Sequence, residues 1–502
     1  MTRFVMVADL ERCVGCQTCT AACRHSNATS PAVQWRRVLD IESGVYPEVS
    51  RTFVPVGCQH CEDPPCMHVC PTTATRKRDD GIVTVDYDIC IGCAYCDVAC
   101  PYQARFKIEK EAFAYGKAMD NEKAREDERR IGVSQKCTFC SDRIDFGKEN
   151  GLVPGVDPRA TPACVNACIA DALHFGDIED PNSNVSALLR DNSSFRMHAE
   201  LGTEPNFHYL HDRRHTPELT GGGGPIRGEG IEPRHQKHWD WKAAMNFLLG
   251  GSGASLFMLA FAYGVTPASM LALIMMAAGL GILLFKIGRP LRFLYVLRQP
   301  QRSWMSREAW IALALFPAGG LFVLTGFFAP AEFAWLGVIA SVAACGFLVA
   351  QAMILKEAKG IPAWRTPHIV HLIVSTGLAE GAALLCLFQP IPIVLAGLVA
   401  IRGGSWLIYR QAVVGKDGPA RMHDVLRYYS PWMLWVGVAA PLALIAVDLV
   451  RLAALVVVAS GFALKFIIVT RAGFQQGFSI ERARGALRPG WSSTTEHATR
   501  PT

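Results

Sequence analysis

The chain has 502 residues, 50% of them hydrophobic, and its 50 Lys and Arg against 44 Asp and Glu give a formal net charge of +6. The basic residues lie mostly between apolar runs. We therefore interpret them as membrane topology signals, and they exclude a nucleic-acid-binding surface. Residues 1–180 hold sixteen of the eighteen cysteines, whereas residues 243–471 are dominated by apolar side chains. We therefore expect one soluble domain followed by one membrane domain.

The cysteines of the first part form four groups of four. The third group, "CIGCAYCDVACP" at residues 90–101, has the spacing of bacterial ferredoxins, in which three thiolates wrap one cluster and the fourth ligates its neighbour. Zinc ribbons and disulfides are the alternatives. Zinc sites lack the final C-x3-C-P, and disulfide scaffolds are small and secreted. The pattern therefore predicts two pairs of iron-sulfur clusters.

These motifs resemble the four-cluster iron-sulfur subunit of the membrane-bound molybdopterin oxidoreductases, the family of dimethyl sulfoxide reductase, polysulfide reductase and quinone-linked sulfite dehydrogenase. The resemblance covers residues 1–215. It implies an α+β bacterial ferredoxin-like domain with four [4Fe-4S] clusters, in which the first cysteine group pairs with the fourth and the second with the third. The implied ligand sets are Cys13, Cys16, Cys19 and Cys168; Cys137, Cys140, Cys164 and Cys23; Cys58, Cys61, Cys66 and Cys100; and Cys90, Cys93, Cys96 and Cys70.

Two polar segments divide the chain further. Phe106–Arg130 is dense in both signs of charge, and it is either a solvated segment or part of the docking face for a catalytic subunit. Residues 216–241 include four consecutive glycines, which predict a flexible linker.

Eight apolar segments of spanning length follow, and they predict an all-α eight-helix transmembrane bundle at residues 242–478, with a tail at 479–502. The segments are residues 243–264, 267–286, 309–328, 333–355, 367–388, 391–410, 431–449 and 452–471. Lys and Arg are concentrated in the loops after the even-numbered spans and in the tail, whereas the alternate loops contribute only Arg451. The positive-inside rule then predicts a bacterial inner-membrane protein with both termini and the ferredoxin domain in the cytoplasm. The N-terminus has neither an apolar signal region nor twin arginines, so we expect no export.

The charged stretch between the second and third spans suggests a site. "KIGRPLR" and "SWMSRE" resemble the quinone-binding region of eight-span anchor subunits of the dimethyl sulfoxide reductase type, with Gly288, Pro290, Arg292 and Glu308 matching and Lys286 in place of the usual His. Lys286 or Arg292 is expected to polarise a quinone oxygen, and Glu308 to exchange protons. The alternative is that the two cations only reach lipid headgroups.

Other charges lie deeper. Glu380 and Arg402 sit near the middle of two consecutive antiparallel spans, which predicts an intramembrane pair that either fixes helix register or relays protons. Lys465 has no evident partner. The membrane half offers His368 and His371 on one span and His423 in a loop, so facing helices do not supply two heme ligands and we expect no heme.

The chain thus resembles a fusion of the iron-sulfur subunit with the membrane anchor. It has no domain for a molybdopterin, so the resemblance implies a separate catalytic subunit and no substrate-converting residue in this chain. Cytoplasmic orientation favours sulfite oxidation to sulfate with electrons passed to quinone. The alternatives are a dimethyl sulfoxide or polysulfide type of reductase that takes electrons from quinol, and a general ferredoxin-quinone electron-transfer hub.

Overall fold

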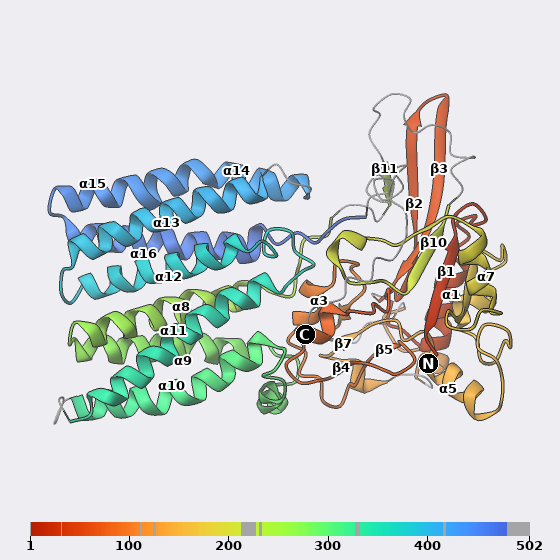
Figure 1. Cartoon of the computed structure of the whole chain (residues 1–502), viewed down its shortest axis with the longest axis horizontal. Helices are drawn as coiled ribbons and strands as arrows, with labels where there is room; N and C mark the ends of the chain where they lie inside the picture. The colour runs from red at the N-terminus through yellow and green to blue at the C-terminus, as the bar shows by residue number, and fades with distance from the viewer. Residues whose placement is uncertain are drawn as a thin grey trace.

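The structure, a computed structural model, describes residues 2–31, 33–110, 113, 115–123, 127–211, 227–229, 233–326, 332–414 and 418–478. Its first half is built from short strands and helices, and its second half is a bundle of long helices that run side by side (Figure 1). The ferredoxin-like half followed by an all-helical half confirms the predicted fold class.

A four-stranded sheet ties together the two ends of the ferredoxin-like half. The strand β1 (Phe4–Asp9) is parallel to β10 (Phe207–Leu210) and antiparallel to β8 (Leu173–Asp177), and β9 (Ser194–Phe195) extends the sheet beyond β10. The run "FVMVA" is buried throughout because the central strand is covered on both faces. One covering element is α7 (Asn184–Asp191), whose N-terminus is capped by Ser183.

The cysteine groups lie on short helices and the loops that precede them. These helices are α1 (Thr18–Asn27), α2 (Pro65–His68), α3 (Tyr95–Ala99), α5 (Ser141–Glu149) and α6 (Ala163–Asn166). Short ribbons connect them, namely β4 (Thr75–Lys77) with β5 (Val83–Val85) and β6 (Phe106–Lys107) with β7 (Ser134–Gln135). The remaining short helices are α4 (Asp120–Lys123), η1 (Glu128–Arg130) and η2 (Ala199–Leu201).

A long ribbon projects from this half (Figure 1). It consists of β2 (Arg36–Val45) and β3 (Glu48–Gly57), and β11 (Arg227–Glu229) adds a third strand along β2. Part of the predicted linker is therefore a strand, while its four glycines and the predicted tail from residue 479 lie outside the described residues.

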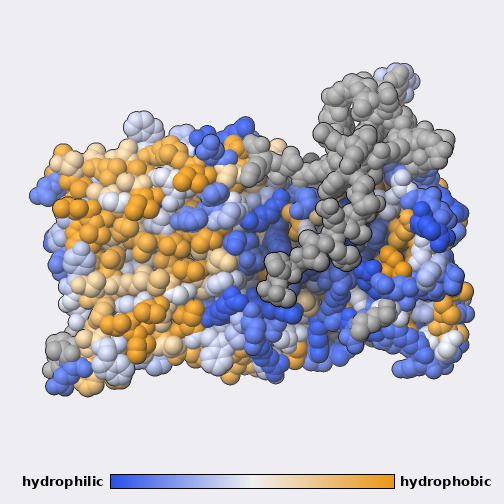
Figure 2. Space-filling view, viewed as in Figure 1, coloured by the Kyte–Doolittle hydropathy of each residue, from blue (hydrophilic) through white to orange (hydrophobic). Residues whose placement is uncertain are grey.

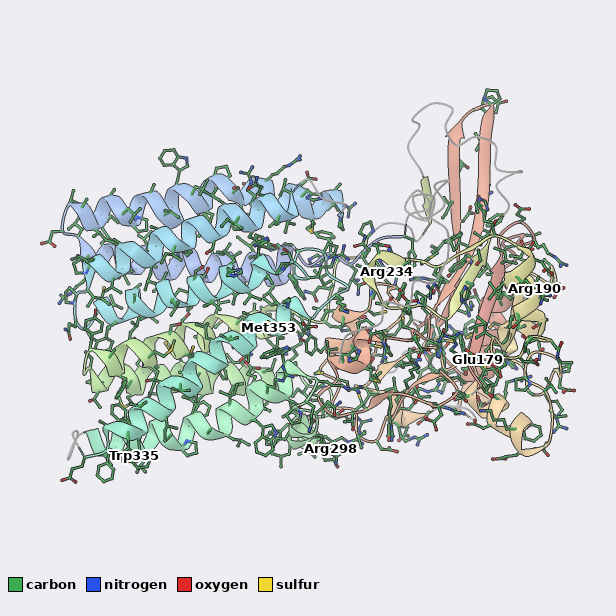
Figure 3. All side chains as sticks on the ribbon, viewed as in Figure 1. Glu179, Arg190, Arg234, Arg298, Trp335 and Met353 are labelled. Atoms are coloured by element: carbon green, nitrogen blue, oxygen red, sulfur yellow. The ribbon has the colours of Figure 1, made fainter. Side chains whose placement is uncertain are left out.

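Within the described residues, eight helices are long and apolar enough to cross a membrane, as predicted. Their surface is mostly apolar, whereas hydrophilic residues gather over the ferredoxin-like half (Figure 2). Trp335, 57% exposed, lies at the end far from the ferredoxin-like half, and Arg298 lies at the near end (Figure 3). The helices are α8 (Trp241–Ala262), α9 (Thr266–Leu284), α10 (Trp304–Gly326), α11 (Ala334–Lys356), α12 (His368–Cys386), α13 (Pro392–Val413), the seventh span from α14 (Ala420–Leu434) through η4 (Trp435–Ala439) to α15 (Ala440–Ala446), and α16 (Val450–Phe466) continued by η5 (Ile467–Arg471).

The seventh helix begins at Ala420, earlier than the predicted residue 431. Its first turns carry charges, which masked the helix in a hydropathy pattern, but Met422 and Leu426 are buried in the core. Between α9 and α10 the chain forms the 3₁₀ helix η3 (Pro290–Arg298).

The two halves share one hydrophobic core. It joins Tyr95 of the cluster region to Trp239 and Trp364 of the helical half, and the Tyr95 hydroxyl donates to the Ile354 carbonyl at 2.7 Å. After the last span the chain returns to the ferredoxin-like half, where Phe478 is buried in the core of that half. This continuous packing holds the cluster loops against the helix ends.

Candidate electron-transfer site

The structure brings together the first cysteine group with the fourth, and the second with the third. Two cavities of about 20 Å³ are each lined by four thiols. The first is lined by Cys13, Cys16, Cys19 and Cys168, and the second by Cys58, Cys61, Cys66 and Cys100. Each cavity therefore collects one of the ligand sets implied by the family resemblance.

The other two sets also gather. Asn27 Nδ2 lies 3.8 Å from both Cys23 Sγ and Cys140 Sγ, so both thiols lie near the same amide group. Burial raises the pKa values of the Cys90 and Cys93 thiols, and the nearby Cys70 thiol also raises both. Among the described residues no group of three or more His, Cys, Asp or Glu side chains could hold a single metal ion. Thiols that surround a space in this way fit the corners of a cluster.

Two buried arginines lie among the thiols. Burial opposes the charge of Arg36, yet the nearby Cys164 and Cys137 thiols raise its pKa above the ordinary value. Arg105 NH2 donates to Cys66 Sγ at 2.9 Å, and its NH1 donates to Thr75 Oγ1 at 3.2 Å. A buried guanidinium is costly without an anion. Iron-sulfur clusters with four thiolate ligands are anionic, so the donor set and these cations fit such clusters.

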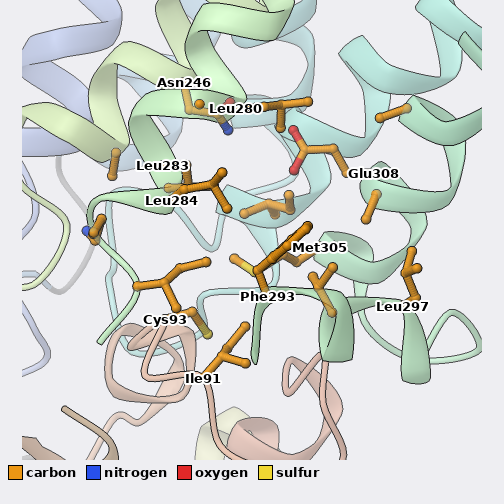
Figure 4. A pocket seen from close by; sticks show the side chains of 18 of the residues that line it. Ile91, Cys93, Asn246, Leu280, Leu283, Leu284, Phe293, Leu297, Met305 and Glu308 are labelled. Carbon is orange, nitrogen blue, oxygen red and sulfur yellow. The ribbon is translucent and has the colours of Figure 1, made fainter. Parts of the chain in front are cut away.

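A cavity of about 450 Å³ lies at the junction of the two halves. Its floor includes Ile91 and Cys93 from a cluster loop, and Glu308 and Asn246 face it from the opposite side (Figure 4). The walls come from the ends of α8, α9, α10 and α11 and from η3, and they are almost entirely apolar. A predicted cluster ligand therefore lines a space with the size and polarity typical of a small-molecule site.

Two titratable groups line this cavity. Glu308 is only 3% exposed, and the amides of Asn246 and Gln351 lie beside its carboxyl group. Lys286 donates to the His238 carbonyl and lies 5.8 Å from the centre of the Trp239 ring. Burial lowers the pKa of Lys286 to about 7, although Asp240 acts in the opposite direction. An amine with this pKa donates or accepts a proton near neutral pH.

Known proteins share the cluster region. Residues 49–117 match the 4Fe-4S dicluster domain family. The chain is 41% identical over 224 residues to a subunit of the selenate reductase of Mesobacillus selenatarsenatis, an alignment that covers 41% of this chain and 72% of that protein. It is 38% identical over 253 residues to a subunit of the sulfite dehydrogenase of Allochromatium vinosum, covering 46% and 94%. It is also 38% identical over 233 residues to Hdr-like menaquinol oxidoreductase iron-sulfur subunit 1 of Archaeoglobus fulgidus, covering 41% and 82%.

The chain belongs to the iron-sulfur subunit family of the molybdopterin oxidoreductases. It is an electron-transfer subunit with a membrane helical region, and its family implies a catalytic partner subunit. The alignments with these relatives cover less than half of this chain.

The structure separates the predicted quinone-site residues of this iron-sulfur subunit into two pairs. Lys286 and Glu308 line the junction cavity. The Arg292 guanidinium instead donates to the Tyr87 carbonyl at 2.7 Å and to the Cys90 carbonyl at 3.4 Å. Arg292, one of the two cations expected to polarise a quinone, is therefore absent from the lining of the junction cavity, and its charge is directed to a cluster loop.

Gly288, the fourth predicted residue, also belongs to the contact between the halves. A Cβ atom at Gly288 would overlap the carbonyl oxygen of Gly132, and a Cβ at Gly92, in the cluster loop, would meet the same oxygen. Gly92 and Gly132 have positive φ values of 70°. The three glycines therefore allow three backbone segments to touch. The described part of the Phe106–Arg130 insertion lies nearby, where Arg289 donates to the Glu128 carbonyl at 3.1 Å.

Glu380 forms an ion pair with a different residue from the one predicted. Glu380 Oε2 pairs with Lys465 Nζ at 2.5 Å, and both residues are fully buried. Arg402 instead donates to the Gly437 carbonyl and, at 3.2 Å, to Ser460 Oγ. The Glu380–Arg402 pair is thus corrected to Glu380–Lys465, because α16 packs against α12 and directs its lysine at this carboxylate.

Sequence reasoning missed several residues of the cavity. Trp239 lines the cavity, and its Nε1 donates to the Cys93 carbonyl at 3.3 Å. Asn246 and Gln351 are amides within apolar runs, and such residues in membrane helices are costly unless they have a partner or a function. Two costly amides within apolar runs are the feature by which the sequence could have indicated Asn246 and Gln351 as site residues.

Proposed function

We propose that this iron-sulfur subunit carries electrons, through four [4Fe-4S] clusters, between a molybdopterin catalytic subunit and a membrane quinone bound in the junction cavity. The observation that carries the proposal is that Cys93, a predicted cluster ligand, lines the same apolar cavity as Glu308. An electron carrier at the wall of the quinone cavity removes the need for a heme. When bound, the cluster held by Cys90, Cys93, Cys96 and Cys70 supplies one-electron transfer to or from the quinone.

Quinone chemistry also moves two protons, and the cavity offers a group for each. Lys286, with a pKa near neutrality, donates to one quinone oxygen or accepts its proton. Glu308 serves the opposite side of the cavity, where its buried carboxyl lies beside two amides. Apolar walls exclude water from the ring, so both protons pass through these residues.

The cavity wall also offers an entry for an apolar ligand. Leu284, Leu294 and Leu313 line the cavity and are 38%, 60% and 53% exposed, respectively. These residues belong to the helical half, whose outer surface is apolar (Figure 2). A quinone therefore reaches the cavity directly from the bilayer, between α9 and α10.

For the complete complex we propose sulfite oxidation to sulfate on the cytoplasmic side of the inner membrane. Two observations support this choice. The sulfite dehydrogenase subunit is matched over 94% of its length. The cation-rich connections between helices lie at the end of the bundle nearest the ferredoxin-like half, which the positive-inside rule assigns to the cytoplasm. The similarity to the selenate reductase subunit favours, as the second candidate, a reductase that receives electrons from quinol.

The proposal is tested on the complex purified from membranes. Metal analysis should find molybdenum or tungsten in a co-purifying large subunit, and sulfite should reduce an added quinone analogue. Selenate, dimethyl sulfoxide and tetrathionate, each supplied with quinol, test the reductase candidate in parallel. Absence of a molybdenum or tungsten subunit, or of any quinone-linked activity with these substrates, would contradict the proposed function.

A further inference from the structure

A line of buried polar side chains continues from the junction cavity into the helical half. It starts at Glu308 and Asn246 on the cavity wall and passes through Gln351 of α11 to Lys465 of α16 and Glu380 of α12. None of these residues is more than 4% exposed. Ionisable groups inside membrane helices are expensive to maintain and mark functional paths. We call these five residues the polar track.

Hydrogen bonds tie part of the polar track to the main chain of α8. Gln351 Nε2 donates to the main-chain carbonyl of Asn246 at 3.0 Å. Lys465 Nζ donates to the carbonyl of the next residue, Phe247, at 3.2 Å and to Glu380 Oε2 at 2.5 Å. Gln351 and Lys465 therefore donate to adjacent peptide groups of α8.

Glycines of α8 make space for these groups. A Cβ atom at Gly250 would clash with Gln351 Nε2. A Cβ at Gly251 would lie 3.2 Å from Gln351 Oε1 and 3.3 Å from Lys465 Nζ. One small residue thus touches both polar groups, which places them within reach of a bridging water.

Four oxygens along the polar track have no hydrogen-bond partner among the described residues. They belong to Glu308, Asn246, Gln351 and Glu380, one from each side chain, and all four are buried. Buried acceptors of this kind are usually satisfied by ordered water when space permits. Acidic side chains joined by amides and water are a recurrent form of proton relay in membrane proteins.

We infer that the polar track carries protons between the quinone cavity and the Lys465–Glu380 pair. The inference rests on the proposed quinone reaction. In the proposed reaction, reduction of one quinone takes two electrons from the clusters and two protons. Lys286 donates one proton, and Glu308 donates the other and regains it along the track from Glu380.

The pair is the end of this path. The pair stores one proton: Glu380 is a neutral acid beside the Lys465 ammonium before turnover and a carboxylate after it has given its proton to the cavity. After the quinol leaves, a proton that enters the cavity returns along the same track and recharges Glu380. Ser252 Oγ donates to Glu380 Oε2 at 2.5 Å and holds the carboxyl in place. Beyond the pair, Arg402 is fully buried and keeps a fixed positive charge, which opposes further movement of a proton.

Two variants of the assembled complex in membranes test the inference. The double variant Glu380→Gln with Lys465→Met removes both charges and leaves no unpaired buried ion. Gln351→Leu removes the amide between cavity and pair and leaves both charges intact. The control is Thr376→Val on α12, which removes a buried hydroxyl that donates to the Leu372 carbonyl of its own helix. Quinone-linked turnover, artificial-dye turnover and the solvent isotope effect are measured for each.

Both test variants should lose about tenfold or more of the quinone-linked rate, with a larger solvent isotope effect and an unchanged dye-linked rate. The control should match the parent in every measurement. Parental quinone-linked rates and isotope effects in Gln351→Leu would overturn the inference, even if the double variant does not accumulate. A parent complex without quinone-linked turnover would instead refute the proposed function, so the two failures are distinguishable.

Discussion

The substitution Glu308→Gln separates proton transfer from every other role of the junction cavity. Glu308 is 3% exposed, lines the cavity and lies beside the Asn246 and Gln351 amides. Glutamine keeps nearly the same volume and can still hydrogen-bond to those amides, but it does not carry a proton. It also avoids the desolvation cost of a buried carboxylate, so we expect the folded protein to be at least as stable as the parent.

The expected loss follows from the burial of this carboxyl. A positioned acid or base contributes about 10²- to 10⁴-fold to a rate, and no bulk water replaces a group at the closed end of an apolar cavity. Quinone-linked turnover of the complex should therefore fall about 100-fold or more. Turnover with an artificial dye that accepts electrons directly from the clusters should stay at the parental rate, as should the iron content.

The matched control is Glu332→Gln, the same chemical change at an exposed carboxyl far from the ferredoxin-like half. It should leave both rates unchanged. A parental quinone-linked rate in Glu308→Gln would show that this carboxyl transfers no proton to quinone and would refute the role we assign to the cavity. A parallel fall in dye-linked turnover would instead indicate damage to the clusters.

The remaining predictions concern the junction, the clusters and the orientation. Gly288→Ala should lower the melting temperature of the complex, because the added Cβ overlaps the Gly132 carbonyl. The control Gly397→Ala should leave it unchanged, because a Cβ there meets nothing within 4 Å. Equal melting temperatures of the two variants would contradict the glycine contact. Arg292→Ala should lower the free energy of unfolding by about 1.5–3 kcal/mol through lost charged hydrogen bonds and leave the KM for quinone unchanged. A raised KM with unchanged stability would indicate that Arg292 binds quinone. The purified chain should contain about sixteen iron atoms and no heme, and an iron content near twelve or a reduced heme band would argue against four [4Fe-4S] clusters. A fluorescent protein fused after Thr502 should be active and an alkaline phosphatase there inactive, and the opposite result would remove the reason for preferring sulfite oxidation.

The sequence by itself determined the features that depend on local spacing. Cysteines two or three residues apart are held by one loop and a short helical turn, so "CIGCAYCDVACP" indicates a cluster site wherever the segment lies in the fold. Spans are equally local, because an apolar run of sufficient length satisfies its own backbone hydrogen bonds inside a helix. Both kinds of pattern predicted the ferredoxin-like half and the eight helices without knowledge of their packing.

Only the tertiary structure decided which distant groups meet. The sequence predicts Arg292 in the cavity and Glu380 beside Arg402, yet Arg292 binds carbonyls of a cluster loop and Glu380 pairs with Lys465. The physical reason is that the partner of a helical side chain depends on the rotation of each helix about its axis and on which helices pack together. Residue spacing within one segment contains neither quantity. The junction cavity is decided in the same way, since Cys93 and Glu308 become neighbours only when the ferredoxin-like half packs against the helix ends.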